Sequence, residues 1–167
     1  MTGASIADDR AAFRRVCGEF ATGVTAVTAR TADGELAALT ANSFTSVSLD
    51  PPLVLVCVGT SVSCAGVMRR AEHVAIHILG ESHEHVARRF ATSGTSAEER
   101  LDGIARVADE GGAPVLDECT ARFAGPVERC VDAGDHMIIV VHAEHAEIVA
   151  EDHPALMFFR GKFWSPS

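Results

Sequence analysis

The residues with the clearest chemical potential lie in one short polar stretch. Residues 40–48 read Thr-Ala-Asn-Ser-Phe-Thr-Ser-Val-Ser and stand between an apolar segment and Pro51-Pro52. Short hydroxyl side chains and exposed backbone amides can hold a planar ligand that has many hydrogen-bond acceptors and an anionic tail. The same composition is typical of a turn whose side chains bond their own backbone. From the residue types alone, both interpretations stay open.

His136 is the second residue that could do chemistry. It directly follows Gly134-Asp135, a turn sequence, at the start of a predicted strand. A lone histidine is structural more often than catalytic, so its position alone assigns it no role.

The other histidines and the cysteines do not predict a metal site. His83 and His85 lie next to each other on a predicted helix with side chains pointing apart, and His142 and His145 should face opposite sides of a strand. Neither pair has the His-Glu-x-x-His spacing of a zinc site. The five cysteines include no Cys-x-x-Cys pair, which favours reduced thiols in a cytosolic protein.

The elements that must position these residues are mostly strands. In the first half, Ser5-Ile6-Ala7-Asp8 fits a capping box, so a helix should begin there and end before Gly23. Asp33-Gly34 predicts a hairpin turn, and the prolines at 51 and 52 end the polar stretch. The first helix should have an apolar face formed by Phe13, Val16, Cys17 and Phe20. Strands are expected at 24–29, 35–41 and 53–58, and a second helix at 64–70. The continuous apolar run of 53–58 predicts burial on both faces.

The second half also alternates between strands and short helices. Residues 73–79 alternate as a strand with one exposed face, and 82–90 read as a helix capped by Ser82. Residues 92–113 predict a mobile excursion with a short helix at about 97–104. Strands are expected at 119–131, 136–149 and 155–164. We therefore expect a mainly β fold with flanking helices, a closed antiparallel barrel in a single domain spanning 1–167.

Charge and hydropathy exclude several classes of protein. The chain has 167 residues and a net charge of −9, with no cluster of Lys or Arg. Nucleic acid and an anionic membrane surface are therefore not expected as partners. The chain shows neither a signal peptide nor an apolar run of about 18 residues, so we expect a cytoplasmic protein.

Four stretches of the chain together resemble a known family. They are 20–28 (Phe-Ala-Thr-Gly-Val-Thr-Ala-Val-Thr), 40–56 (Thr-Ala-Asn-Ser-Phe through Pro-Pro-Leu-Val-Leu-Val), 133–136 (Ala-Gly-Asp-His) and 154–163. With their spacing they resemble the short-chain flavin reductases, the reductase components of two-component flavin-dependent monooxygenases. The resemblance covers about residues 10–165 and implies a flavin-binding split barrel.

The resemblance assigns roles to the candidate residues. It implies that backbone amides of the polar stretch bond the edge of the flavin ring, because amide dipoles stabilise the negative charge that reduction brings. It also implies that Ser63 and Arg89 approach the flavin phosphate, with Ser61 nearby, whereas Arg88 is interpreted as part of a solvated helix face. His136 would position the nicotinamide, since hydride transfer needs no proton relay. The ring-binding residues carried over are Thr40, Ala41, Asn42, Ser43, Ser46, Val47 and Ser48.

The function implied is hydride transfer from NADH or NADPH to FMN or FAD, which supplies reduced flavin to a monooxygenase. A homodimer with the flavin site at its interface is expected as well. One alternative is a flavin carrier or sensor without reductase activity. Another is a relative of pyridoxamine-phosphate oxidase, but the 14 Lys and Arg residues, against 23 Asp and Glu, form no basic cluster that could bind two phosphates.

The chain departs from the family at Gly125, which stands where the family usually has cysteine. Gly125-Pro126 predicts a bend in the sheet.

Overall fold

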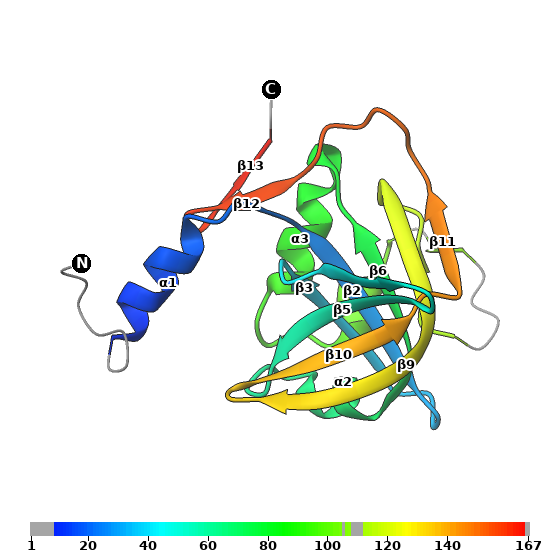
Figure 1. Ribbon diagram of the computed structural model, residues 1–167. Helices are drawn as coiled ribbons and strands as arrows, with labels where there is room; N and C mark the ends of the chain where they lie inside the picture. Colours follow the sequence, from blue (N-terminus) through cyan, green and yellow to red (C-terminus); the bar gives the residue numbers. More distant parts are fainter. Residues whose placement is uncertain (1–8, 105, 108–111, 166–167) are drawn as a thin grey trace.

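One antiparallel sheet forms the body of the protein. The computed structural model in Figure 1 describes residues 9–104, 106–107 and 112–165. The strands of the main sheet run in the order β3-β2-β6-β9-β10-β5-β4, and β11 pairs with β9. Their bounds are β2 Thr25–Thr31, β3 Leu36–Ala41, β4 Thr45–Leu49, β5 Pro52–Gly59, β6 Ala71–Ile78, β9 Ala121–Ala133, β10 His136–His142 and β11 His145–Ile148.

The expectation of a closed barrel was wrong. The strand order is an open path with β3 at one end and β4 at the other. After β3 ends at Ala41 the chain turns away, and β4 pairs with β5 only. Where β3 could have met β5, the Ser43 hydroxyl bonds Cys57 instead, accepting from its N–H (2.9 Å) and donating to its C=O (3.0 Å). A side chain therefore connects these segments in place of a strand ladder.

Two clusters of apolar side chains pack on opposite faces of the central strands. On β2, Val27 belongs to one cluster and Ala26 to the other, because successive side chains of a strand alternate between faces. Strand β6 is buried on both faces over Val74–His77, so the exposed face predicted for residues 73–79 was wrong. Strand β5 instead buries only alternate residues, so the prediction of two buried faces for 53–58 was also wrong.

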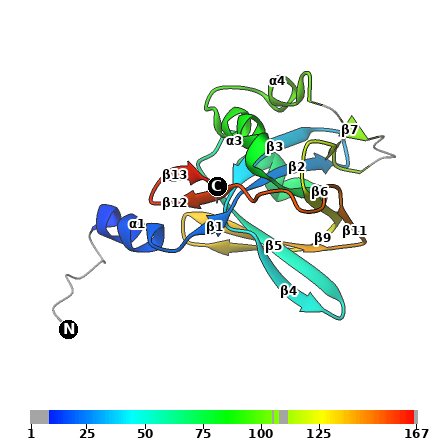
Figure 2. The same ribbon diagram turned by 90° about the horizontal axis from the view of Figure 1, so that it is seen from above.

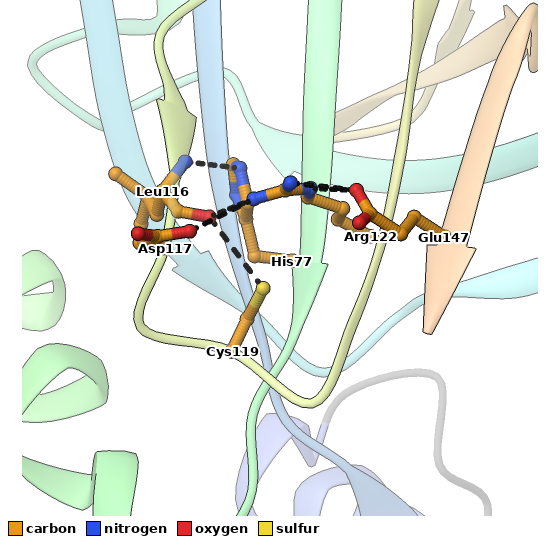
Figure 3. A network of polar contacts seen from close by, with 6 residues as sticks. All are labelled: His77, Leu116, Asp117, Cys119, Arg122 and Glu147. Atoms are coloured by element: carbon orange, nitrogen blue, oxygen red, sulfur yellow. Dashed lines mark hydrogen bonds and ion pairs between the residues drawn. The ribbon is translucent and has the colours of Figure 1, made fainter. Parts of the chain in front are cut away.

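Buried His77 fixes the segment before β9 against β6 (Figure 3). The Leu116 N–H donates to His77 Nε2 (3.0 Å), so the ring proton is on Nδ1, which bonds the Ala26 carbonyl at 2.9 Å. Desolvation is the main cause that lowers the pKa of His77 from 6.5 to about 4. Arg122 contacts the same segment through the Leu116 carbonyl and pairs with Glu147 of β11.

The helices are short and cover the sheet unequally. Helix α1 (Arg10–Gly18) is capped by Asp9, whose Oδ1 accepts from the Ala12 N–H, whereas the cap predicted at 5–8 lies outside the described residues. Helix α3 (Glu84–Ala91) packs on the second cluster, follows the 3₁₀ turn η1 (Glu81–His83) and has His83 rather than Ser82 before its first turn. The remaining helices are α2 (Ala65–Arg70) and α4 (Ala97–Leu101), the latter with a Ser96–Glu99 capping box.

Strand β9 changes its partners at the bend predicted for Gly125-Pro126. Its first part, up to Pro126, pairs with β6 and β11, and its second part, from Val127, pairs with β10. The single strand expected over 136–149 is accordingly divided into β10 and β11.

Two small sheets complete the fold. Strand β7 (Arg106–Val107) lies in the segment expected to be a mobile excursion and pairs with β8 (Val115–Leu116), which follows that segment. The segment predicted as the last strand is a hairpin of β12 (Met157–Phe159) and β13 (Lys162–Trp164), and β12 also pairs with β1 (Thr22–Gly23). Figure 2 shows α1 and the β4–β5 hairpin extending away from the body in different directions. Among the described residues, no helix has the length and apolar character needed to span a membrane.

Candidate functional site

The polar stretch is less irregular than the sequence predicted. Thr40 and Ala41 end β3, and residues 45–49 form β4, which pairs with β5 through a register shift between Ser46 and Ser48. Only residues 42–44 lie outside both strands. Strand β4 is an edge strand, so the backbone groups on its outer side face away from β5.

Hydrogen bonds to other segments of the chain hold several side chains of this stretch in place. Thr40 Oγ1 donates to the Ala87 carbonyl of α3 (2.6 Å), and Asn42 Nδ2 donates to Thr22 Oγ1 of β1 (3.2 Å). The Ser43 hydroxyl is occupied by Cys57, as described above. The turn interpretation, in which these side chains bond their own backbone, is therefore wrong for Thr40, Asn42 and Ser43, because their side chains bond other segments of the chain.

Unlike these side chains, three backbone amides of the same stretch have no hydrogen-bond partner within the described residues. Within the part of the chain that the structure describes, no hydrogen bond is formed by the N–H groups of Asn42, Ser43 and Phe44. Asn42 is exposed, and Ser43 and Phe44 are half-buried. Side chains therefore fix the shape of the segment and leave three backbone donors for a ligand.

The first hollow adjoins these donors. It has a volume of about 500 Å³ and lies between the end of α1, β1 and residues 42–45. Its walls combine apolar and polar groups, which suits a flat aromatic ligand with polar edges. The wall residues that matter here are Phe20, Thr22, Asn42, Ser43 and Phe44.

A second hollow of about 610 Å³ opens at Thr40, on the α3 side of the polar stretch. Its lining combines hydroxyl residues and Arg100 with apolar residues such as Val62 and Phe90, and contains neither Asp nor Glu. The hydroxyl residues are Thr40, Ser61, Ser63 and Ser93. A hollow that joins several hydroxyls to one cation can bind an anion.

The remaining predicted residues lie outside both hollows. Arg89 donates from Nη2 to the Glu99 carbonyl (2.6 Å). Ser46, Val47 and Ser48 lie on β4, and the Val47 side chain is exposed. Ala41 is buried, with its carbonyl bonded to Thr25 Oγ1 (2.7 Å).

His136 begins β10 and is exposed near the loop that follows β5. Its Nδ1 donates to the Asp135 carboxylate (2.7 Å), and this bond is the main cause that lowers the pKa of Asp135. Asp135 also accepts, through its carbonyl, from the Thr60 N–H (2.9 Å), so the turn is tied to the Ser61–Ser63 loop. Nε2 remains available to a ligand on the exposed side.

Sequence reasoning missed Arg100, and one signal in the sequence could have found it. Glu98-Glu99-Arg100 reads as an exposed charged run. Arg100 nevertheless stands three residues after Ala97 and four before Ile104, on the apolar face of the predicted helix. A charged side chain at such a position either extends along its aliphatic part to solvent or binds buried partners. Arg100 is buried, so it binds buried partners.

Comparisons with known proteins agree with this arrangement. A family described as flavin reductase like domain matches residues 17–166. The chain is 40% identical over 151 residues to FMN reductase (NADH) SmoA of Agrobacterium fabrum, covering 90% of this chain and 83% of that protein. It is 34% identical to the solved NADH:FAD oxidoreductase SgcE6 of Streptomyces globisporus, in complex with NAD and FAD fragments, with a TM-score of 0.85 and 98% of both chains covered.

Some relatives are longer than this chain. It is 35% identical over 154 residues to the reductase component of flavin-dependent trigonelline monooxygenase from Acinetobacter baylyi. That match covers 92% of this chain and 48% of that protein, so the chain spans about half of this relative's length.

Proposed function

The chain belongs to the flavin reductase like family, and from this premise we propose that it transfers a hydride from NADH or NADPH to FMN or FAD. The reduced flavin then serves a partner monooxygenase, the role that the name of the Acinetobacter relative gives to that protein. The observation that carries the proposal is the set of three unused amides at residues 42–44 beside the first hollow.

The residues of this chain orient and stabilise rather than transfer protons. Hydride passes from the nicotinamide ring to the flavin ring, and no side chain has to give or take a proton in that step. The amides of Asn42, Ser43 and Phe44 offer fixed donors where the negative charge of the reduced ring develops. They need no rearrangement, because the side chains of Asn42 and Ser43 are already held by hydrogen bonds. We assign the ring contact to Asn42, Ser43 and Phe44. The contacts predicted for Thr40, Ala41, Ser46, Val47 and Ser48 stay predictions, because these residues do not line the first hollow.

His136 positions the hydride donor. Because the Asp135 carboxylate can only accept, the Nδ1 atom of neutral His136 carries the proton and Nε2 is an acceptor. Such an acceptor suits the amide N–H of a nicotinamide carboxamide. Asp135 fixes this tautomer and is itself a positioning residue.

A second copy of the chain completes the site. No residue of α1 is buried in one copy, and the apolar side chains Phe13 and Val16 of α1 and Phe20, just after it, are exposed. Phe20 is 76% exposed and also lines the first hollow, so a partner that covers α1 would close that hollow. A homodimer buries this surface without exposing another.

A cytoplasmic location and a single domain over residues 1–167 stay predictions.

The decisive experiment mixes the protein with NADH and FMN, and separately FAD, without oxygen. Oxidised flavin absorbs at about 450 nm, and two-electron reduction removes this absorbance. A reductase therefore bleaches the absorbance at a rate proportional to protein concentration. A carrier or sensor binds flavin, shown by fluorescence quenching, and leaves its colour unchanged. Repeating the reaction with NADPH and comparing kcat/KM identifies the preferred donor.

A further inference from the structure

Arg160 has a backbone conformation that an arginine rarely adopts. It is the first residue of the two-residue loop between β12 and β13, because Phe159 pairs with Lys162. Both loop residues have positive φ, 48° at Arg160 and 77° at Gly161, which is the pattern of a type I′ turn. Glycine or asparagine takes the first position of such a turn with less strain than arginine. The strained backbone indicates that the arginine side chain has a task there.

The Arg160 side chain connects this loop to the end of α1, which lies beside the β12–β13 hairpin in Figure 1. Its Nη2 and Nε donate to the two carboxylate oxygens of Glu19, at 2.6 Å and 3.0 Å, in a bidentate pair. The guanidinium also lies over the Phe159 ring, 4.9 Å from its centroid. The Arg160 N–H donates to the Gly18 carbonyl (3.1 Å). Arg160 and Glu19 thus form a clamp between the loop and the helix.

The clamp contributes little to the stability of the fold. The side chains of Arg160 and Glu19 are 64% and 58% exposed, and water and salt screen surface ion pairs of this kind. Its effect on position is larger, because no residue of α1 is buried. Packing against the body therefore does little to fix the end of this helix.

The two segments that the clamp joins both continue into the wall of the first hollow. After Glu19 the chain passes to residues 20–22, which line that hollow. From Arg160 the chain runs back along β12, whose Phe158 pairs with Thr22 of the same wall. Among the described residues that line the hollow, neither member of the clamp appears. The clamp therefore holds the wall from outside.

We propose that the clamp positions the α1 wall of the first hollow for the flavin ring, which makes Arg160 a positioning residue of the reductase reaction. This inference rests on the proposed function, because it takes the first hollow as the ring site. The clamp holds residues 20–22 in place before flavin arrives, so less order has to be gained on binding. Arg160 takes no part in hydride transfer, and its loss affects flavin binding rather than the rate of the bound complex.

Arg160→Asn separates flavin binding from stability. Asparagine tolerates positive φ, and asparagine before glycine is a preferred pair in a type I′ turn, so thermal stability should stay equal or rise. Because the guanidinium is lost, the Kd for FMN from fluorescence quenching and the KM for FMN should each rise about threefold to tenfold. The kcat at saturating FMN and NADH should keep its wild-type value.

Glu19→Gln tests the clamp from its other side and should raise the same Kd. Each single change breaks the same ion pair, so the double variant should bind FMN no more weakly than Arg160→Asn alone. Arg70→Gln is the matched control, because Arg70 forms an exposed pair with Glu35 and neither residue lines the first hollow. It should keep the wild-type Kd and KM.

Hydrogen exchange of the flavin-free protein follows the wall without any reaction. The N–H groups of residues 19 and 20 bond carbonyls of α1 at 3.1 Å each, so their exchange reports on the helix end. Exchange should be faster in Arg160→Asn and Glu19→Gln than in wild type. Wild-type affinity for FMN in both single variants would overturn the inference, and so would losses of affinity that add up in the double variant. If the proposed function fails instead, wild type itself reduces no flavin with NADH.

Discussion

At the scale of single residues, Ser43 shows how one side chain can shape the candidate ring site. Its hydroxyl makes two hydrogen bonds to the backbone of Cys57 and so holds the end of the β3 segment against β5. The Ser43 N–H itself forms no hydrogen bond within the described residues. Structure and ligand binding therefore depend on different groups of the same residue.

Ser43→Ala should weaken both stability and flavin binding. The change leaves the Cys57 N–H without its acceptor, so we expect a loss of about 1 to 3 kcal/mol in the free energy of unfolding. FMN affinity should fall as well, because residues 42–44 lose their fixed shape. Urea unfolding and fluorescence quenching measure the two effects. Ser46→Ala removes a hydroxyl without a described partner and should keep the stability of wild type; equal stability of both variants would contradict this account.

His77 gives a pH dependence whose sign follows from its environment. In the folded protein the ring stays neutral down to about pH 4, whereas in the unfolded chain it binds a proton below about pH 6.5. The unfolded state therefore binds more protons between these values. Stability falls as pH is lowered from about 6.5 to about 4, by up to about 3 kcal/mol, and this contribution is fully present above pH 6.5.

Urea unfolding at a series of pH values tests this prediction. His77→Phe should be less stable than wild type at pH 7, because it leaves the Leu116 N–H without its acceptor. Its stability should nevertheless fall less steeply between pH 6.5 and 4. His145→Gln, at an exposed position on β11, is the control and should keep the wild-type slope. If His77→Phe also kept that slope, the assignment would be wrong.

At the scale of elements, β9 depends on Gly125. The strand exchanges its pairing with β6 and β11 for pairing with β10 around this residue. A Cβ at Gly125 would lie 1.9 Å from the His142 carbonyl oxygen and 3.0 Å from the Glu144 nitrogen. Both are backbone atoms in the crossing from β10 to β11, so they cannot move aside without breaking the sheet.

Gly125→Ala should therefore cost about 4 kcal/mol or more, or prevent folding. Thermal unfolding and soluble yield measure the effect. Gly66→Ala is the matched control, because a Cβ there would meet only the end of the Arg70 side chain at 3.7 Å. It should gain about 0.5 to 1 kcal/mol, as alanine favours helix α2. A folded Gly125→Ala protein with wild-type stability would disprove the close contact.

Sequence patterns predicted the local elements better than the way they associate. The helices at 64–70 and 82–90, the Asp33-Gly34 hairpin and the bend at Gly125 are local features, set by capping, turn residues and backbone freedom. The burial of β5 and β6 was predicted wrongly, because the faces that other segments cover depend on tertiary packing. The open path of the sheet depends on hydrogen bonds of Ser43 that no periodicity encodes.

The candidate site was predictable in part for a similar reason. The polar stretch was recognisable from its composition and its resemblance to the flavin reductases. Its free amides could not be identified, because which N–H groups lack partners depends on the pairing of β4 with β5. Arg100 was missed since its acidic neighbours hid its place on the apolar helix face, whereas Arg89 was predicted from its match to a basic position of the family.

At the scale of the whole molecule, several exposed large apolar side chains lie on parts that extend from the body. Helix α1 and the residues just after it contribute Phe13, Val16 and Phe20, and β4 contributes Val47 and Leu49, the last of these 96% exposed. Figure 2 shows both elements reaching outward. A homodimer that covers these side chains would bring a second chain to the edge of the first hollow, which Phe20 lines.

Val16→Asp should shift the protein from dimer to monomer. Val16 is 68% exposed in one copy, so the charge is tolerated in a monomer but not in an apolar interface. Light scattering after gel filtration measures the mass, and FMN affinity should fall by about tenfold or more because the hollow loses its cover. Ile148→Asp changes an exposed apolar residue of β11 and should stay dimeric. A wild-type monomer would refute the interface.

The most direct measurement is a crystal structure of the protein with FMN. The account predicts the flavin ring in the first hollow, with its polar edge within hydrogen-bond distance of the amides of Asn42, Ser43 and Phe44. Electron density for the ring at another place, or an empty hollow with those amides bonded to other peptide groups, would contradict it.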